Sequence, residues 1–183
     1  LENQKVLTQE REMELVQDIK DEAQWLIRIV ENLLSVTRIN GENARINTED
    51  EVVEEIISSA VIKFNKRFPE ASVEVKMPEE FLMVAMDGVL IEQVLVNLLE
   101  NAVNGCIECG SRDEITVNLR MKKEKLVIVC SNPCKTDLVI ENDIIKPKGT
   151  GIESILMAID KYDGNIRYQM EDGILTACVI LNC

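Results

Sequence analysis

The sequence predicts an α/β two-layer sandwich, in which helices cover a mixed, mainly antiparallel sheet and one long helix leads into the two layers. Segments with the apolar periodicity of helices are interspersed with segments of the apolar and polar alternation typical of half-buried strands. Apolar residues make up 46% of the 183 residues, enough for a substantial core. Gly and Pro number only 8 and 4, so a disordered or collagen-like chain is excluded.

The first predicted element is a long helix over residues 9–40. Its apolar residues follow the alternating three- and four-residue spacing of a packed seam: Leu15, Ile19, Leu26, Ile29, Leu33 and Val36. A single helix of this length cannot bury such a face by itself, which favours a helical hairpin or a dimeric bundle. The alternative is an ordinary core helix. We therefore expect two parts, residues 1–40 and residues 41–183.

The second part contains three further helices. Thr48-x-x-Glu51 is a capping-box pattern, which predicts that the second helix begins there, after a short strand at residues 45–48. The third helix is expected at 89–104, and the fourth from Gly151 to Tyr162. Expected strands lie at 72–77, 81–86, 115–121, 126–130, 165–170 and 174–181, the last two joined by a tight turn at Asp172-Gly173, and residues 132–148 are expected to form a loop.

Charge and composition narrow the function classes. The net charge of −13 repels nucleic acid, so we expect no nucleic-acid partner. The chain contains no histidine, which excludes a Ser-His-Asp or Cys-His catalytic site within it. Cys106-Ile-Glu-Cys109 has the spacing of a metal or redox pair, but no second pair or histidine completes a ligand set, and reduced thiols are expected.

The third helix carries an unusual polar edge. Asn97 and Asn101 are four residues apart, so their amides lie on the same side of the helix, and Asn104 continues that side. Asparagine is a mediocre helix former, so the pattern needs an explanation. One is a pair of neutral oxygen donors that face a hard cation and a polyphosphate. The other is a solvated helix edge.

A second candidate feature is Lys148-Gly149-Thr150-Gly151, directly before the fourth helix. Glycines allow close approach of the backbone to a ligand, and the free N–H groups at a helix start attract phosphate. A simple turn is the alternative. Lys135 and Lys146 in the preceding loop, together with Lys148, would add local positive charge, unless they are ordinary loop lysines.

These features together resemble a known family. Asn97-Leu-Leu-Glu-Asn101-Ala102 resembles the N box of the ATP-binding domain of sensor histidine kinases, within the superfamily of gyrase, Hsp90 and MutL type ATPases, and Gly149-Thr-Gly151 resembles its second glycine box. Residues 21–39 are similar to the second helix of the dimerisation and histidine-phosphotransfer region, especially in the KdpD group. From Ala102 onward, residues 162–168 and 171–175 look more like the peptide-responsive quorum-sensing kinases.

The resemblance covers essentially the whole chain and implies a site for ATP and Mg²⁺. Asn101 would hold the metal and Asn97 would lie near the phosphates, and both would be catalytic. The loop at 133–148 would close as a lid over the nucleotide. The implied ATP-binding residues are Asn97, Asn101, Asn104, Asn132, Lys148, Gly149, Thr150 and Gly151.

The first glycine box of the family departs from its usual Asp-x-Gly-x-Gly pattern. Ser131-Asn132-Pro133-Cys134 stands in its place, without either glycine. Asn132 replaces the aspartate that binds the adenine amino group, with Ser131 as the alternative register. An amide oxygen can still accept a hydrogen bond, but it brings no charge.

The expected function is that of the ATP-binding catalytic domain of a two-component sensor histidine kinase. The acceptor histidine would precede Leu1, in a longer and membrane-anchored protein whose cytoplasmic part this chain represents. Expected partners are ATP, a response regulator and a second copy bound through the long helix, with signal transduction by phosphorelay. The alternative is a catalytically degenerate domain of the same fold that acts as a dimerising regulatory module.

Overall fold

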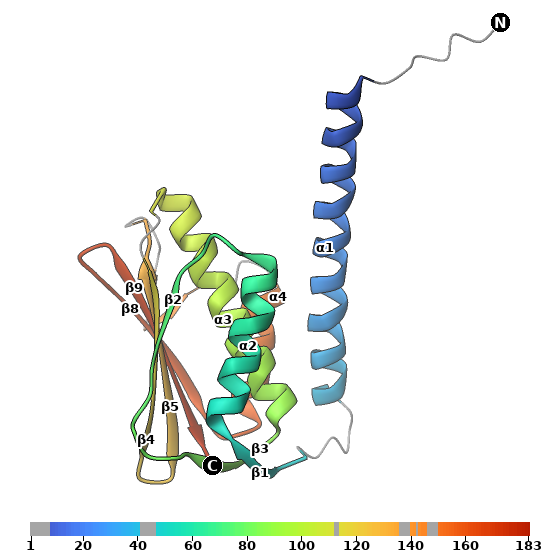
Figure 1. Ribbon diagram of the computed structural model, residues 1–183. Coiled ribbons are helices and arrows are strands. Elements are labelled where there is room, and N and C mark those ends of the chain that lie inside the picture. The colour runs from blue at the N-terminus through green and yellow to red at the C-terminus, as the bar shows by residue number, and fades with distance from the viewer. Residues whose placement is uncertain (1–7, 41–46, 112–113, 136–139, 142, 146–149) are drawn as a thin grey trace, which may run out of the picture.

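The computed structural model describes residues 8–40, 47–111, 114–135, 140–141, 143–145 and 150–183. A five-stranded sheet in the order β2-β4-β5-β9-β8 is covered on one face by α2, α3 and α4, while α1 stands beside this helical layer (Figure 1). The predicted two-layer sandwich is therefore confirmed. The helices are α1 (Gln9–Asn40), α2 (Val53–Arg67), α3 (Gly88–Cys109) and α4 (Thr150–Asp160). The strands are β1 (Glu49–Val52), β2 (Val73–Lys76), β3 (Met83–Met86), β4 (Ile115–Lys122), β5 (Lys125–Pro133), β6 (Ile140–Glu141), β7 (Ile144–Ile145), β8 (Asn165–Glu171) and β9 (Ile174–Asn182).

The sheet is mixed, as the sequence predicts. β2 and β4 are parallel, because α3 lies between them in the chain, and the other pairs of the sheet are antiparallel. Side chains alternate along β4 and β8, so that Ile115, Val117 and Leu119 of β4 and Ile166 and Tyr168 of β8 are buried. Asp172 and Gly173 both have positive φ, 49° and 78°, which matches the twist of the β8–β9 hairpin.

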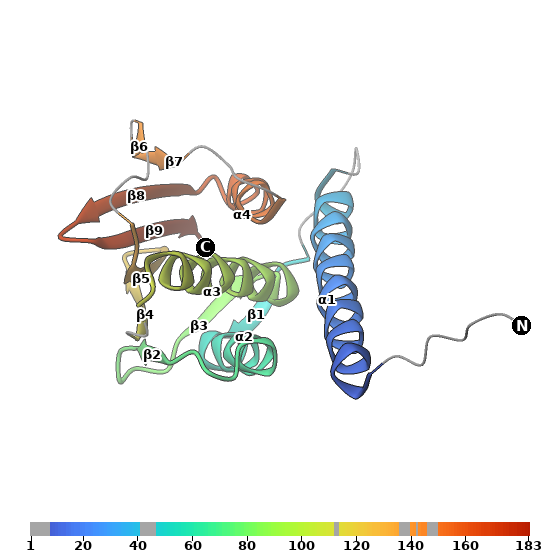
Figure 2. The same cartoon turned by 90° about the horizontal axis from the view of Figure 1, so that it is seen from above.

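α3 lies in the centre of the helical layer, between α2 and α4 (Figure 2). It begins where the Asp87 side chain accepts a hydrogen bond from the Leu90 amide at 3.0 Å. It ends at Gly110, which has a φ of 73°. The helix is five residues longer at its C-terminal end than the sequence predicts. Its largest fully buried side chains are Ile91, Leu95 and Leu99.

The predicted start of the second helix is wrong. Residues 49–52 form β1, which pairs antiparallel with β3, and α2 begins only at Val53, without a side-chain cap on Val52. Tertiary contacts fix this start: the Val53 amide donates to the Leu82 carbonyl, and the Leu82 amide donates to Glu54 Oε1. Pairing with β3 overrides the local capping signal. The strand expected at 45–48 falls partly outside the described residues.

The predicted loop at 132–148 contains regular structure at its described positions. β5 continues to Pro133, and β6 pairs with β7. The Tyr168 amide, in turn, donates to the Asp143 carbonyl at 2.8 Å, which ties this segment to β8.

The long helix α1 is confirmed over 9–40, and its apolar seam is only partly covered at the described side chains. α1 contacts α4, and Leu15 and Ile29 are half-buried, whereas Ile19 and Leu26 are exposed. Within the described residues, no helix has both the length and the apolar character that a membrane span requires. The division at residues 40 and 41 stays a prediction.

Candidate functional site

The amides of α3 differ sharply in their surroundings. Asn97 is only 2% exposed, and its Oδ1 accepts a hydrogen bond from Gln93 Nε2 at 3.3 Å. Within the described part of the chain, its Nδ2 has no hydrogen-bond partner. A buried polar group without a partner costs about 1–3 kcal/mol, so such atoms mark places where a ligand or an ordered water completes the site.

Asn101 and Asn104 are exposed, one and two turns further along the same side of α3. Asn101 faces the start of α4, because a Cβ placed on Gly151 would lie 3.7 Å from Asn101 Oδ1. A side chain longer than a methyl group at position 151 would fill the space before the Asn101 amide. The structure therefore brings Asn101 close to Gly151, which lies 50 positions further along the sequence. Asn97 lies one turn before Asn101 on α3.

The structure places Asn132, and not Ser131, toward the helices. Asn132 is buried at 4% exposure, and its Nδ2 donates to the Pro133 carbonyl at 2.7 Å. A Cβ on Gly105 of α3 would lie 2.7 Å from this Nδ2. The hydroxyl of Ser131, by contrast, forms a cross-strand hydrogen bond with that of Thr176 at 3.0 Å. Of the two residues that could replace the family's aspartate, only Asn132 faces α3, and Ser131 does not.

Several predicted site residues lie outside the described residues. These are Lys146, Lys148 and Gly149, together with much of the predicted lid. Thr150 is the first residue of α4, and Lys135 is exposed. The predicted role of this loop is therefore a hypothesis that rests on the sequence.

Sequence reasoning missed two features of α3. The first is Glu100, which lies between Asn97 and Asn101 in the sequence but is buried and forms an ion pair with Arg67 of α2. The second is Gly105, whose absent side chain makes room for Asn132. A glycine inside a strongly apolar helix is a detectable signal, because it is unfavourable there unless a close contact needs it.

The six cysteines are free thiols. Cys109 Sγ donates to the Cys106 carbonyl at 3.2 Å, so it provides a hydrogen-bond donor for a carbonyl group in the last turn of α3. Burial raises the pKa of Cys130 to about 12, with the nearby Cys106 as a smaller cause. The described residues contain no cluster of three or more cysteine and acidic side chains that could hold a metal ion. The buried thiols of Cys106 and Cys130 pack within the hydrophobic core.

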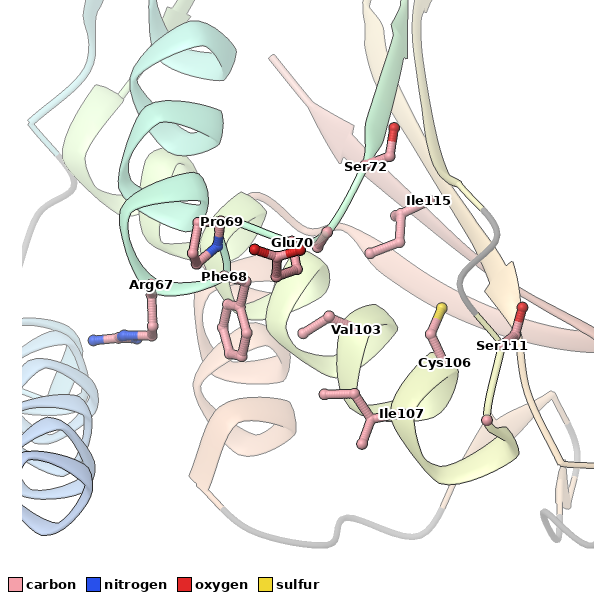
Figure 3. A pocket seen from close by; sticks show the side chains of 12 residues that line it. Arg67, Phe68, Pro69, Glu70, Ser72, Val103, Cys106, Ile107, Ser111 and Ile115 are labelled. Atoms are coloured by element: carbon pink, nitrogen blue, oxygen red, sulfur yellow. The ribbon is translucent and has the colours of Figure 1, made fainter. Parts of the chain in front are cut away.

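A cavity of about 480 Å³ opens between the α2–β2 connection and the C-terminal end of α3 (Figure 3). Its lining is mostly apolar and includes Phe68, Val103, Cys106 and Ile115. None of the predicted site residues lines it. The candidate site is separate from this cavity, because its residues lie where Asn101 faces the start of α4 and where Gly105 faces Asn132 of β5.

The arrangement of the candidate site is suited to a polyphosphate with a hard cation. Amide oxygens are good ligands for Mg²⁺, and they add no negative charge that would repel phosphate. The N-terminal end of α4 presents free N–H groups close to Asn101. The Asn132 amide lies one turn of α3 beyond Asn101, at a position suited to the base of a nucleotide.

Comparison with known proteins agrees with this geometry. Residues 86–182, just over half of the chain, match the GHKL domain family. The sensor protein KdpD of Clostridium acetobutylicum is 45% identical over 102 residues, which cover 56% of this chain and 11% of that protein. The chain thus spans about a ninth of the length of this relative.

Two solved structures have the same fold. The Acinetobacter baumannii histidine kinase AdeS superimposes with a TM-score of 0.74 at 18% identity and covers 92% of this chain and 83% of that one. The histidine kinase ThkA, in complex with the response regulator protein TrrA, superimposes with a TM-score of 0.67 at 18% identity. The superposition covers 99% of this chain and 52% of the ThkA chain. The chain therefore belongs to the GHKL domain family and resembles, within it, sensor histidine kinases of the KdpD type.

Proposed function

We propose that this chain is the ATP-binding catalytic part of a sensor histidine kinase and that it transfers the γ-phosphoryl group of ATP to a histidine outside the chain. One observation carries this proposal: the exposed amide of Asn101 lies against the bare backbone of Gly151 at the start of α4, one turn along α3 from the buried amide of Asn97, whose Nδ2 has no partner among the described residues. Membership of the GHKL domain family supports it.

The residues present fit a nucleotide with Mg²⁺. Asn101 Oδ1 would be the metal ligand, Gly151 would leave room for the phosphates, and Asn132 would accept from the adenine amino group. When bound, Mg²⁺ supplies neutralisation of the charge on the triphosphate. The protein would position the nucleotide and stabilise its charge electrostatically, which are the main contributions that a protein makes to phosphoryl transfer.

The side chains at the site favour transfer over hydrolysis. An amide such as that of Asn97 cannot take a proton from water. The nearest carboxylate along the helix, Glu100, is turned away and paired with Arg67. Since the chain has no histidine, the acceptor must come from another segment or another molecule.

We also propose two partners, a response regulator and a second copy of the chain, and a cytoplasmic location for the domain in a longer protein. A response regulator would receive the phosphoryl group, as the solved complex of ThkA with TrrA suggests by analogy. A second copy would pair through α1, whose Trp25, Leu26 and Val30 are about half exposed. The domain would act on the cytoplasmic side of a membrane-anchored sensor, an inference from its likeness to KdpD.

The central test is isothermal titration of the chain with Mg²⁺-ATP. We expect saturable binding that requires Mg²⁺ and that Asn101→Ala abolishes, because the substitution removes the proposed metal ligand. Asn118→Ala is the matched control, since Asn118 is an exposed asparagine on β4 of the sheet. Unchanged affinity in Asn101→Ala would refute the assignment of this residue.

Transfer is tested with radiolabelled ATP and a separate histidine-bearing phosphotransfer hairpin. We expect label on the hairpin and none on this chain, because it has no histidine. Loss of transfer in Asn97→Ala, with the fold intact, would support the role of the buried amide.

A regulatory module without catalysis is the second candidate. It is favoured by the first glycine box, where β5 continues as a regular strand through Pro133 and both family glycines are missing. Under this alternative, the chain would not bind Mg²⁺-ATP at millimolar concentration. The same titration therefore separates the two candidates.

A further inference from the structure

Gly105 lies inside α3, where a glycine is unfavourable by about 1 kcal/mol relative to alanine. A Cβ at this position would lie 2.7 Å from Asn132 Nδ2, 3.5 Å from the Pro133 carbonyl oxygen and 3.6 Å from Cys134 Sγ. The first distance is shorter than any normal contact of a Cβ atom. The two longer distances are ordinary van der Waals contacts, so the missing side chain of Gly105 makes room specifically for the amide of Asn132.

The strand cannot easily move away to relieve such a contact. Asn132 is paired with Leu175 in the β5–β9 ladder, and the Cys134 amide donates to the Gly173 carbonyl at 2.9 Å. The backbone on both sides of Asn132 is thus held by β9 and its turn. A methyl group at position 105 would instead have to displace the Asn132 amide.

The orientation of that amide has a chemical consequence. A carbonyl oxygen can only accept, so the group 2.7 Å from the Pro133 carbonyl is the NH₂ of Asn132. The Oδ1 atom is then the remaining acceptor, and no hydrogen bond to it occurs among the residues that the structure describes. An acceptor at this place pairs with an amino group and repels a carbonyl oxygen.

We propose that Gly105 is a positioning residue for nucleobase recognition. By carrying no side chain, it holds the Asn132 amide with Nδ2 toward Pro133 and with Oδ1 available to the 6-amino group of adenine. The inference rests on the proposed ATP site and deepens it: the chain distinguishes a 6-amino purine from a 6-oxo purine through a neutral amide whose orientation the helix fixes.

The experiment measures the affinities for Mg²⁺-ATP and Mg²⁺-ITP, which differ at position 6 of the base. We expect the wild-type chain to bind ATP at least about tenfold more tightly than ITP, because ITP presents an oxygen to Oδ1. Gly105→Ala should bring the ratio of the two affinities close to one, mainly because it weakens the binding of ATP. Glu108→Ala, an exposed change on the same helix, should leave the ratio unchanged.

A second pair of variants separates positioning from general damage to the fold. Asn132→Ala should lower the ratio as much as Gly105→Ala does, and the double variant should lower it no further, since both changes remove the same contact. If Gly105→Ala does not fold, the double variant should regain the fold, because Asn132→Ala removes the clash. A double variant that stays unfolded would overturn the proposal.

The outcomes also separate this inference from the proposed function. If the wild-type chain binds neither nucleotide, the ATP site itself fails. If it binds both equally, or if Gly105→Ala keeps the wild-type ratio, the ATP site stands and the positioning role of Gly105 is refuted.

Discussion

At the scale of single residues, the neighbouring residues Glu100 and Asn101 of α3 face different helices. Asn101 faces Gly151 at the start of α4, whereas Glu100 is buried against α2 and paired with Arg67. The side chain of Glu100 is 6% exposed and that of Arg67 is 21% exposed, so this pair is shielded from solvent. Glu100 is therefore a structural residue within the motif, and it joins α3 to α2 through its ion pair with Arg67.

We expect Arg67→Ala to destabilise the fold by about 3 kcal/mol, because it leaves the buried carboxylate of Glu100 without its cation. Urea unfolding followed by circular dichroism measures this loss. The double variant Arg67→Met with Glu100→Leu should be clearly more stable than Arg67→Ala. Glu100→Gln should keep its affinity for Mg²⁺-ATP, and a large loss of affinity would place Glu100 in the site.

At the scale of elements, the connection from α4 to β8 depends on Gly164. A Cβ at this position would lie 2.5 Å from the Ile180 carbonyl oxygen and 2.8 Å from the side chain of Ile159. The Gly164 amide also donates to the Ile159 carbonyl at 3.0 Å. The chain that follows α4 thus lies directly against β9, and this contact holds the C-terminal end of α4 close to the sheet.

We expect Gly164→Ala to lower the free energy of unfolding by about 3 kcal/mol, since the clash involves the backbone and cannot be relieved by a rotamer change. Gly110→Ala is the matched control. Gly110 has a φ of 73° and open space around it, so its substitution should cost only about 1 kcal/mol of backbone strain. Equal losses in the two variants, measured by thermal unfolding, would contradict the packing argument.

At the scale of the whole molecule, the burial of weakly acidic side chains makes the free energy of unfolding depend on pH in the alkaline range. Burial raises the pKa of Cys130 from 9.0 to about 12, and it raises the pKa values of Tyr162 and Tyr168 from 10.0 to about 12. Their neutral forms are therefore favoured in the folded state. Between the unfolded and folded pKa values, the folded chain binds more protons than the unfolded chain.

The stability that these groups contribute is fully present below about pH 9 and is lost as the pH rises toward about 12. We expect the urea midpoint to fall steadily over this range. Cys130→Val should reduce the slope, because it removes the buried thiol that titrates first in the unfolded chain. A midpoint independent of pH in this window would contradict the assignment.

The sequence by itself determined the layers, the long first helix, the β8–β9 hairpin and the amide edge of α3. Each of these features can be predicted from local periodicity or from a short motif. Prediction from the sequence failed at Glu49–Val52, where a capping pattern was overridden by pairing with β3. Only the tertiary structure decided that Asn132 and not Ser131 faces α3, that Glu100 turns to Arg67, and that Gly105 makes room for Asn132. The physical reason is distance along the chain: these contacts join residues about 27 to 45 positions apart, and the packing of sheet against helix fixes them where no local pattern can.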